Sequence, residues 1–245
     1  METTQGIYSV NGVYKPTRQD LHGSIIQDIL VDAPIQNNPP DSILLGGGVA
    51  AGKSSTSGMY LKVYHDEGMP LTYINSDDIK KYLPEYVYAL DEGNPDAAKI
   101  VHDESSDIAY RIIEQCIREK RQFMYDGTMK NTEKYKELIH RLKSEGYKVS
   151  LVVVDISVEL AKSRAKLREE IEGRVVPEKI IEESHAKVSK TFSEIKGDVD
   201  SYIVYDNTGK EPIPFLIKNA YDEPEEIQDE SRLELFYAKS QIVTK

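Results

Sequence analysis

The sequence predicts an α/β fold with a mostly parallel five-stranded sheet and helices on both faces. Short apolar segments alternate with segments of helical periodicity along most of the chain, a pattern typical of parallel sheets. The segment Val149–Val154 is almost continuously apolar, as expected of a strand that is covered on both faces. Polar or glycine-rich residues follow most of the apolar segments, and ligands bind at that end of the strands in open α/β sheets.

Five short apolar segments are the predicted strands, taken in chain order. They are Ile43–Leu45, Leu71–Asn75, Gln122–Tyr125, Val149–Val154 and Tyr202–Tyr205. The residues that follow the first, second, third and fifth of them read GGGVAAGKS, SDD, DGT and DNTG. Because the carboxyl ends of parallel strands meet at one edge of a sheet, we expect these four segments to lie together.

Helical periodicity, capping residues and breaks at Gly or Pro predict the helices between the strands. In the first of them, Leu21, Ile25 and Ile29 recur at helical spacing. The predicted helices are Arg18–Val31, Ser54–His65, Asp78–Leu83, Asp96–Arg121, Thr132–Glu145, Ser157–Glu172 and Glu178–Ile195. The break Gly173–Pro177 separates the last two, so that Glu172–Val176 is a candidate mobile lid.

The domain organisation is expected to be simple. Residues 1–16 show little periodicity and are expected to form a loose N-terminal arm. Residues 17–215 are expected to form one domain that starts with the helix Arg18–Val31. Residues 216–245 are expected to be a C-terminal extension, with a peripheral helix near Ser231–Ser240.

Composition narrows the class of protein. The chain has 245 residues and a net charge of −11, which disfavours binding along the phosphate backbone of DNA or RNA. Its single cysteine, Cys116, cannot form an internal disulfide, so a reducing cytoplasm is the expected compartment. There is no secretory signal and no apolar run long enough to span a membrane, so no membrane association is expected.

The segment Gly47–Ser54 fits the pattern G-x-x-x-x-G-K-[ST] at every fixed position. In this pattern the backbone N–H groups surround phosphates, the lysine reaches the outer phosphates, and the serine hydroxyl binds Mg²⁺. The following helix directs its partial positive charge to the same anion. A glycine-rich turn with an incidental lysine is the alternative, but the motif stands between a predicted strand and a predicted helix. The expected nucleotide-binding residues are Gly47, Gly48, Val49, Ala50, Ala51, Gly52, Lys53, Ser54 and Ser55.

Several carboxylates are candidates for acid–base or metal chemistry. Asp77 and Asp78 directly follow the second strand, where one could act as a base on an acceptor and the other could cap the next helix. Asp126 ends the third strand; it could support Mg²⁺ through water, hold the acceptor together with Thr128, or simply form the Asp-Gly turn. Asp155 resembles a Walker B carboxylate in pattern, although many buried strands end in Asp.

The candidate cations are Arg164, Arg168 and Arg174. The first two lie four residues apart on one predicted helix face, and Arg174 lies in the candidate lid. Such arginines can stabilise the charge that develops on a transferred phosphate. The alternative is a salt-bridged surface with Glu169, Glu170 and Glu172. Glu104, at the start of a long helix, could reach an acceptor hydroxyl or simply favour the helix N-terminus.

Several segments taken together resemble the zeta-toxin family of P-loop kinases. They are GGVAAGKSS, INSDDIKKYLPEY, VHDESSDIAYRIIEQCIREKRQFMYDGTM, GYKVSLVVVDISVELAKSRAKLREE, GRVVP and YDNTG, in that order between Leu21 and Gly209. The resemblance implies a P-loop kinase fold with a small helical lid. It also implies phosphorylation of the sugar 3′-hydroxyl of UDP-N-acetylglucosamine with ATP or GTP and Mg²⁺, by the toxin of a toxin–antitoxin pair.

The resemblance also implies roles for individual residues. Lys53 would bind the nucleotide phosphates, Ser54 would bind Mg²⁺, and Asp77 would be the base on the sugar hydroxyl. Glu104 and Thr128 would hold the acceptor. Arg174 would act on the transferred phosphate, together with Arg164 or Arg168, and Asn207 would lie near the nucleotide base.

The chain departs from the family pattern in the phosphate loop, where Val49-Ala50 stands in place of the proline that many relatives carry. The family also implies a separate small helical antitoxin that blocks the nucleotide site, unless the helix Arg18–Val31 has a similar covering role. Two other functions stay open. The chain could be a kinase of another hydroxylated metabolite, such as a dinucleotide ribose or an antibiotic, or a nucleotide-dependent switch without an acceptor.

Overall fold

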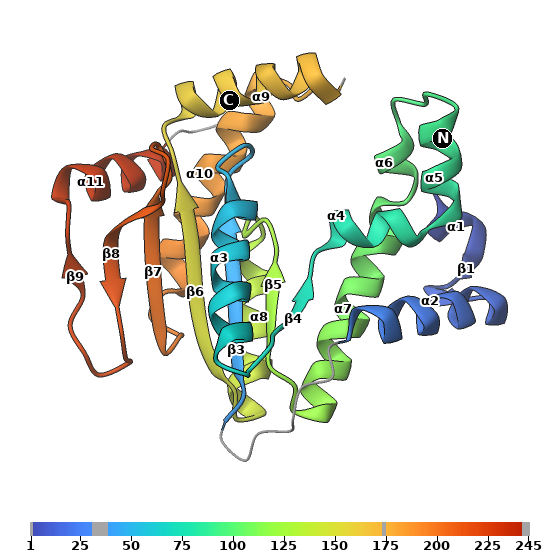
Figure 1. Cartoon of the computed structure of the whole chain (residues 1–245), viewed down its shortest axis with the longest axis horizontal. Coiled ribbons are helices and arrows are strands. Elements are labelled where there is room, and N and C mark those ends of the chain that lie inside the picture. Colours follow the sequence, from blue (N-terminus) through green and yellow to red (C-terminus); the bar gives the residue numbers. More distant parts are fainter. Residues whose placement is uncertain (1, 31–38, 173–174, 242–245) are drawn as a thin grey trace.

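The computed structural model describes residues 2–30, 39–172 and 175–241. A seven-stranded sheet forms its centre, in the order β4-β5-β3-β6-β7-β8-β9 (Figure 1). The first five strands are parallel: β4 (Thr72–Ile74), β5 (Phe123–Asp126), β3 (Asp41–Gly47), β6 (Lys148–Asp155) and β7 (Ser201–Asp206). These are the five predicted strands, and the predicted α/β fold with a mostly parallel sheet is confirmed.

Two further strands extend the sheet beyond the five that the sequence predicts. They are β8 (Ile213–Lys218) and β9 (Glu226–Ile227), and both are antiparallel to their neighbours. Only residues 207–212 separate β7 from β8, which is too short for the crossover that a parallel strand requires. Pro214 weakens the strand signal of β8, and the edge strand β9 has only two residues, so the predicted count of five is corrected to seven.

The central strands are apolar on both faces because helices cover both. Leu44, Leu151 and Val153 point into one core, which α7 (His102–Glu119), α8 (Thr132–Ser144), α10 (Glu178–Ile195) and α11 (Glu230–Ala238) complete. Ile43, Leu45, Val152 and Val154 point into the other, which contains residues of α3 (Lys53–Asp66) and α9 (Val158–Glu172). Successive residues of β6 point alternately into the two cores, which explains why β6 is apolar at nearly every position.

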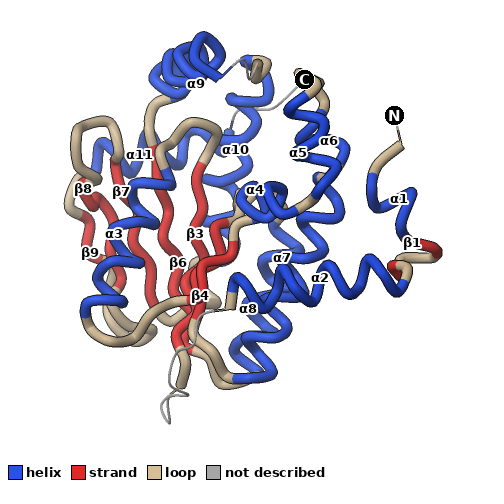
Figure 2. Tube along the Cα trace, turned by 45° about the vertical axis from the view of Figure 1, so that its right-hand side comes forward, coloured by secondary structure: helices blue, strands red, loops and turns tan. Residues whose placement is uncertain are grey.

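A group of short helices lies beyond the β4 edge of the sheet (Figures 1 and 2). It contains α2 (Pro16–Ile29), α4 (Ser76–Ile79), the 3₁₀ turn η1 (Lys80–Tyr82), α5 (Pro84–Asp91) and α6 (Ala97–Ile100). The predicted single helix over Asp96–Arg121 is interrupted at Val101, which separates α6 from α7. The last residue of the predicted helix Arg18–Val31 lies outside the described residues.

Residues 4–14, expected as a loose arm, instead form α1 (Thr4–Tyr8) and a hairpin of β1 (Ser9–Val10) and β2 (Val13–Tyr14). The turn residues Asn11 and Gly12 both have positive φ, 52° and 77°, as a two-residue hairpin turn requires. The Tyr14 hydroxyl donates to Asp107 of α7 at 2.7 Å, which anchors the hairpin on the helical group.

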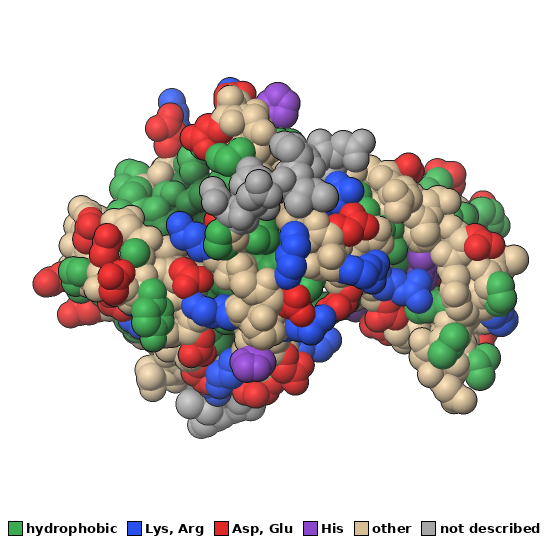
Figure 3. Space-filling view, turned by 90° about the horizontal axis from the view of Figure 1, so that it is seen from below, with side chains coloured by type: hydrophobic (Ala, Val, Ile, Leu, Met, Phe, Trp, Pro, Cys, Tyr) green, Lys and Arg blue, Asp and Glu red, His purple; other side chains and the backbone are tan. Residues whose placement is uncertain are grey.

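The surface carries charges of both signs. In the space-filling view, acidic and basic side chains are interspersed across the face (Figure 3). Among the described residues, no helix combines the length and the apolar character that crossing a membrane requires.

Candidate active site

The glycine loop between β3 and α3 has the backbone geometry of a phosphate cradle. Gly52, the N-cap of α3, has φ of 88°, and Ala50 has φ of 59°. A Cβ on Gly52 would lie 2.2 Å from the side-chain nitrogen of Asn207, so glycine is required there for both space and conformation. The loop therefore leads directly into the N-terminus of α3, where backbone N–H groups and the helix dipole favour an anion.

One cavity of about 280 Å³ joins this loop to residues from distant elements. Gly47–Ser54 line it together with Asp77 from α4 and Thr128 from the segment after β5. Residues of α9, α10 and their connection complete the lining: Ala165, Arg168, Val176 and Ile180. The cavity thus brings together the predicted phosphate loop, the predicted base, one predicted acceptor contact and one predicted arginine.

Lys130 also lines the cavity, and sequence reasoning missed it. It stands two residues after Thr128, in the segment that follows β5. That position at the carboxyl edge of the sheet was a usable signal, because polar residues after a parallel strand face the ligand site. With Lys53 and Arg168 it makes three cations around the cavity, a favourable setting for a phosphorylated ligand.

Asp77 is held at the start of α4 by neighbours on the same segment. Its backbone N–H donates to Oδ1 of Asn75 at 2.8 Å, so Asn75 is the helix cap, a role that we had expected of Asp77 or Asp78. The Asp77 carboxylate pairs with the buried ammonium of Lys80 at 2.5 Å. Asp78 pairs with Lys81 on the exposed side. Only Asp77 of the two aspartates lines the cavity.

Asp126 contacts the loop lysine, Lys53, and is not part of the cavity lining. One of its carboxylate oxygens is 3.7 Å from Nζ of Lys53, and the other accepts hydrogen bonds from the Tyr73 hydroxyl at 2.7 Å and from Asn75 at 3.2 Å. Burial raises the pKa of Asp126 above its ordinary value, and the nearby Lys53 ammonium opposes this rise. The position suits a residue that orients Lys53.

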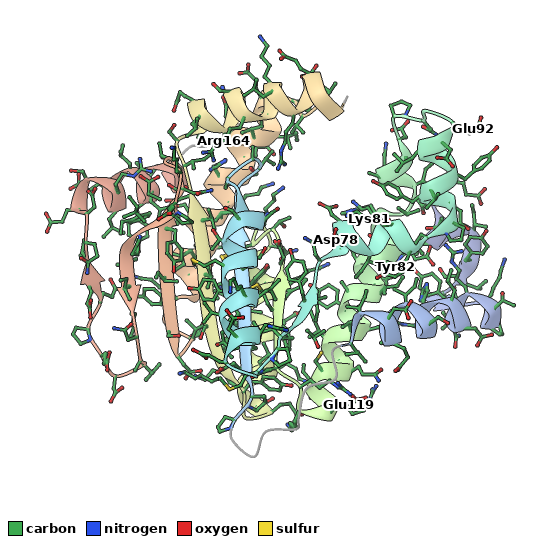
Figure 4. All side chains as sticks on the ribbon, in the orientation of Figure 1. Asp78, Lys81, Tyr82, Glu92, Glu119 and Arg164 are labelled. Carbon is green, nitrogen blue, oxygen red and sulfur yellow. The ribbon has the colours of Figure 1, made fainter. Side chains whose placement is uncertain are left out.

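The predicted arginines Arg164 and Arg168 have different surroundings in the structure. Arg168 lines the cavity, whereas Nη2 of Arg164 donates to the backbone carbonyl of Asn207 at 2.9 Å. In the stick view, Arg164 lies on α9, across from Asp78 and Lys81 on α4 and η1 (Figure 4). Arg174 lies outside the described residues, as does Gly173 beside it.

Asn207, expected near the nucleotide base, makes hydrogen bonds that support the phosphate loop. Its side-chain amide donates to the carbonyl of Ala51 at 2.8 Å, and its backbone N–H donates to the carbonyl of Asp155 at 2.9 Å. Asn207 is buried and is not part of the cavity lining. Its contacts fix the loop residues that surround a phosphate.

Glu104 is not brought to the cavity. It is fully buried and accepts hydrogen bonds from Nε of Arg18 and Nε2 of His22, both at 2.6 Å. Burial alone would raise the pKa of Glu104, but the hydrogen bonds from Arg18 and His22 lower it to about 2. Since Arg111 donates to Nδ1 of His22, the proton of this imidazole is on Nε2. The expected contact of Glu104 with an acceptor is therefore replaced by an internal ion-pair network.

Asp155 does not have the setting of a Walker B carboxylate. Both of its oxygens accept hydrogen bonds from Nζ of Lys239 at 2.6 Å. Among the described residues there is no group of three or more His, Cys, Asp or Glu side chains that could hold a metal ion. Ser54, which lines the cavity in the first turn of α3, fits the Mg²⁺ site of a P-loop protein, where phosphate oxygens and water supply most ligands.

Comparison with known proteins gives one family and a consistent fold. A family model described as Zeta toxin matches residues 27–213. The chain is similar to a solved structure of the PezAT chromosomal toxin–antitoxin system of Streptococcus pneumoniae, with 14% identity, a TM-score of 0.71, and coverage of 94% of this chain and 96% of that one. No match is found among curated proteins.

Two solved complexes of AvrRxo1-ORF1 with AvrRxo1-ORF2 are also similar. The complex with sulphate ions gives 16% identity and a TM-score of 0.74, covering 100% of this chain and 85% of that one. The complex with ATP gives 15% identity and a TM-score of 0.72, covering 100% and 84%. At these identities the likeness establishes the fold.

Proposed function

The chain belongs to the zeta toxin family, and from this we propose that it phosphorylates the sugar 3′-hydroxyl of UDP-N-acetylglucosamine, using ATP or GTP, as the toxin of a toxin–antitoxin pair. Family membership makes the chain a nucleotide-dependent kinase. The acceptor and the biological role are the proposal.

One observation carries the proposal: a single cavity contains both the phosphate loop and Asp77. Phosphoryl transfer to an alcohol needs a phosphate cradle, cations on the transferred group, and a carboxylate that accepts the proton of the attacking hydroxyl. A nucleotide switch needs the cradle but has no use for a carboxylate that lines the same cavity. The arrangement therefore favours transfer to an acceptor.

Each lining residue has a role in this reaction. The backbone N–H groups of the loop and Nζ of Lys53 bind the phosphates of the donor, and Arg168 stabilises the charge on the transferred group. Asp77 accepts the proton of the acceptor hydroxyl, and its ion pair with Lys80 orients the carboxylate. Arg174 is proposed as a further cation on the transferred phosphate, on the resemblance alone.

Mg²⁺ is the proposed metal, with the Ser54 hydroxyl as its protein ligand. When bound, Mg²⁺ neutralises charge on the outer phosphates. Thr128 and Lys130 line the cavity, and we propose that they contact the acceptor. A nucleotide sugar carries a diphosphate, and the positive charge of Lys130 suits it.

A small helical antitoxin is the proposed partner and the cytoplasm the proposed location. The support is the family itself and the likeness to a toxin–antitoxin system. Transfer to another hydroxylated metabolite, such as a dinucleotide ribose or an antibiotic, is the second candidate. It has the same support from Asp77 and the loop, and differs only in what Thr128 and Lys130 recognise.

The test is a phosphate-transfer assay. The purified chain would be given ATP or GTP, Mg²⁺ and UDP-N-acetylglucosamine, with Lys53→Ala and Asp77→Ala as control variants. The proposal predicts a phosphorylated nucleotide sugar that neither variant forms. Nucleotide binding without transfer to this sugar, but with transfer to a dinucleotide or an antibiotic, would overturn the acceptor and support the second candidate.

The toxin role needs a separate test. Induced expression in a bacterial host should arrest growth or cause lysis, and Asp77→Ala should relieve it. Normal growth with the active enzyme present at the same level would contradict a toxin role without affecting the kinase assignment.

A further inference from the structure

Lys239 is a buried lysine that belongs to the C-terminal segment, outside the part of the chain that the family model matches. It lies on the 3₁₀ turn η2 (Lys239–Gln241) that follows α11. Its ammonium donates to both carboxylate oxygens of Asp155 and to the backbone carbonyl of Ile156, each at 2.6 Å. These three acceptors match the three donors of an ammonium group, so Lys239 is fully satisfied.

Asp155 lies directly beside the phosphate loop. It ends β6, and β6 pairs with β3 so that Val154 is opposite Gly47, the first residue of the loop. Asp155 is therefore level with Gly48. A buried, uncompensated carboxylate at this point would repel the phosphates that the loop binds, because charge interactions are strong where water is excluded.

A second contact connects this pair to the loop through α10. Both backbone polar groups of Val49 are bonded: its N–H donates to Oγ of Ser184 at 2.9 Å, and its carbonyl accepts from Nε2 of His185 at 3.0 Å. The His185 ring is so close to the loop that a Cβ on Gly48 would lie 2.4 Å from it. Val49 therefore uses both of its backbone polar groups in contacts with α10.

His185 also faces Asp155. Its Nδ1 is buried, has no hydrogen-bond partner among the described residues, and lies 3.9 Å from Oδ1 of Asp155. Lys239 holds the carboxylate just beyond hydrogen-bond distance from this nitrogen. Contacts therefore run from Lys239 in the C-terminal segment through Asp155 and His185 to Val49 in the loop.

We infer that Lys239 is a positioning residue for nucleotide binding. It neutralises Asp155 beside the loop and fixes the carboxylate that packs against the His185–Val49 contact. It follows that Asp155 is not a magnesium ligand in this chain and that η2 supports the nucleotide site through Asp155 without lining the cavity. The inference rests on the nucleotide site of the proposed function, but not on the identity of the acceptor.

The test compares Lys239→Met, Asp155→Asn and the double variant with the wild type. Each single variant leaves one buried charge unpaired, so both should unfold at lower temperature, and the double variant should regain stability. Nucleotide affinity should behave differently. Lys239→Met leaves a negative charge beside the loop and should weaken ATP binding about tenfold, whereas Asp155→Asn removes that charge and should not weaken it. The double variant should bind ATP nearly as the wild type does.

Binding would be measured by calorimetry with ATP, with and without Mg²⁺, well below the unfolding temperature of every variant. Lys187→Met is the matched control, because Lys187 lies on the exposed side of α10 and pairs only with Glu183 in the described residues. Equal ATP binding by Lys239→Met and the wild type would overturn the inference. So would a loss of Mg²⁺-dependent binding in Asp155→Asn, which would restore Asp155 as a metal ligand. A wild type that binds neither ATP nor GTP would overturn the proposed function as well.

Discussion

At the scale of single residues, the carboxylates of Asp77 and Asp126 are held in opposite ways. Asp77 is largely exposed to the cavity and pairs with the buried ammonium of Lys80. Asp126 is buried, and its pKa is raised by that burial. Two carboxylates whose environments differ in this way are suited to different tasks: Asp77 to proton transfer, and Asp126 to holding Lys53.

Lys80 should position Asp77 rather than bind substrate. Lys80→Met should therefore lower kcat by about 10- to 100-fold, because a displaced base costs rate, while leaving the nucleotide KM unchanged. Lys80→Arg should recover much of the lost rate. The matched control is Lys81→Met, since Lys81 pairs with Asp78 on the exposed side. An equal loss of kcat in both methionine variants would remove the special role of Lys80.

The ionised, buried carboxylate of Asp126 should lower the free energy of unfolding, and the protein retains this residue for function. A raised pKa means that the folded state favours the protonated carboxyl, so the ionised form at neutral pH is destabilising. Asp126→Asn keeps an acceptor for Tyr73 and should unfold at the same or a higher temperature at pH 7, with reduced phosphate transfer. The wild type should gain on the variant as the pH falls through the raised pKa. A lower unfolding temperature for the variant at pH 7 would show that the Lys53 contact outweighs the burial cost.

At the scale of elements, the N-terminal helix α2 is joined to α5 and α7 by charges rather than by apolar contacts alone. Arg18 donates to Glu104 of α7 and, through both terminal nitrogens, to Glu85 of α5 at 2.9 and 2.7 Å. The apolar spacing of Leu21, Ile25 and Ile29 was enough to predict the helix. The buried positions of Arg18 and His22 could not be predicted, because Glu104, the partner that they share, is more than 80 residues away in sequence.

Arg18→Met should destabilise the fold by about 3–5 kcal/mol, the cost of leaving a buried carboxylate without its partner. The free energy of unfolding in urea is the measurement, with Arg118→Met on the exposed side of α7 as the control. The double variant Arg18→Met/Glu104→Gln should recover much of the loss. If Arg18→Met unfolded like the control, the network would contribute little.

Glu104 also predicts how stability depends on pH. Its folded-state pKa of about 2 lies below its ordinary value, so its contribution is complete above the unfolded pKa of about 4.3. This contribution is lost as the pH falls toward 2. Unfolding of the wild type should therefore become easier between pH 5 and 3 by more than unfolding of Glu104→Gln does. Parallel pH curves for the two proteins would contradict the shift.

Sequence patterns predicted the structural features that depend on local periodicity. They missed the features that depend on contacts between residues far apart in the sequence. The five parallel strands and the phosphate loop follow from short-range patterns, and they are where the sequence placed them. The strands β8 and β9 carry weak signals at a sheet edge, whereas the turn residues Asn11-Gly12 were a usable hairpin signal that was overlooked. Ser184, His185 and Lys239 have roles only because the fold brings remote segments together.

At the scale of the whole molecule, the site forms where two parts of the structure meet. The sheet and its helices supply the phosphate loop and Arg168, while the helical group beyond β4 supplies Asp77. The chain carries a net charge of −11, yet three cations, Lys53, Lys130 and Arg168, surround the cavity. This local reversal of charge favours a phosphorylated small ligand over an extended nucleic acid.

The most direct test of the site is a single-turnover measurement of phosphate transfer to UDP-N-acetylglucosamine by the wild type and by Asp77→Asn. ATP binding by both proteins would be measured in parallel. Loss of a general base lowers the rate by about 10²- to 10⁴-fold, so the variant should bind ATP normally and transfer phosphate at least 100-fold more slowly. Transfer at the wild-type rate by Asp77→Asn would show that the base is another residue and that the assignment of the cavity is wrong.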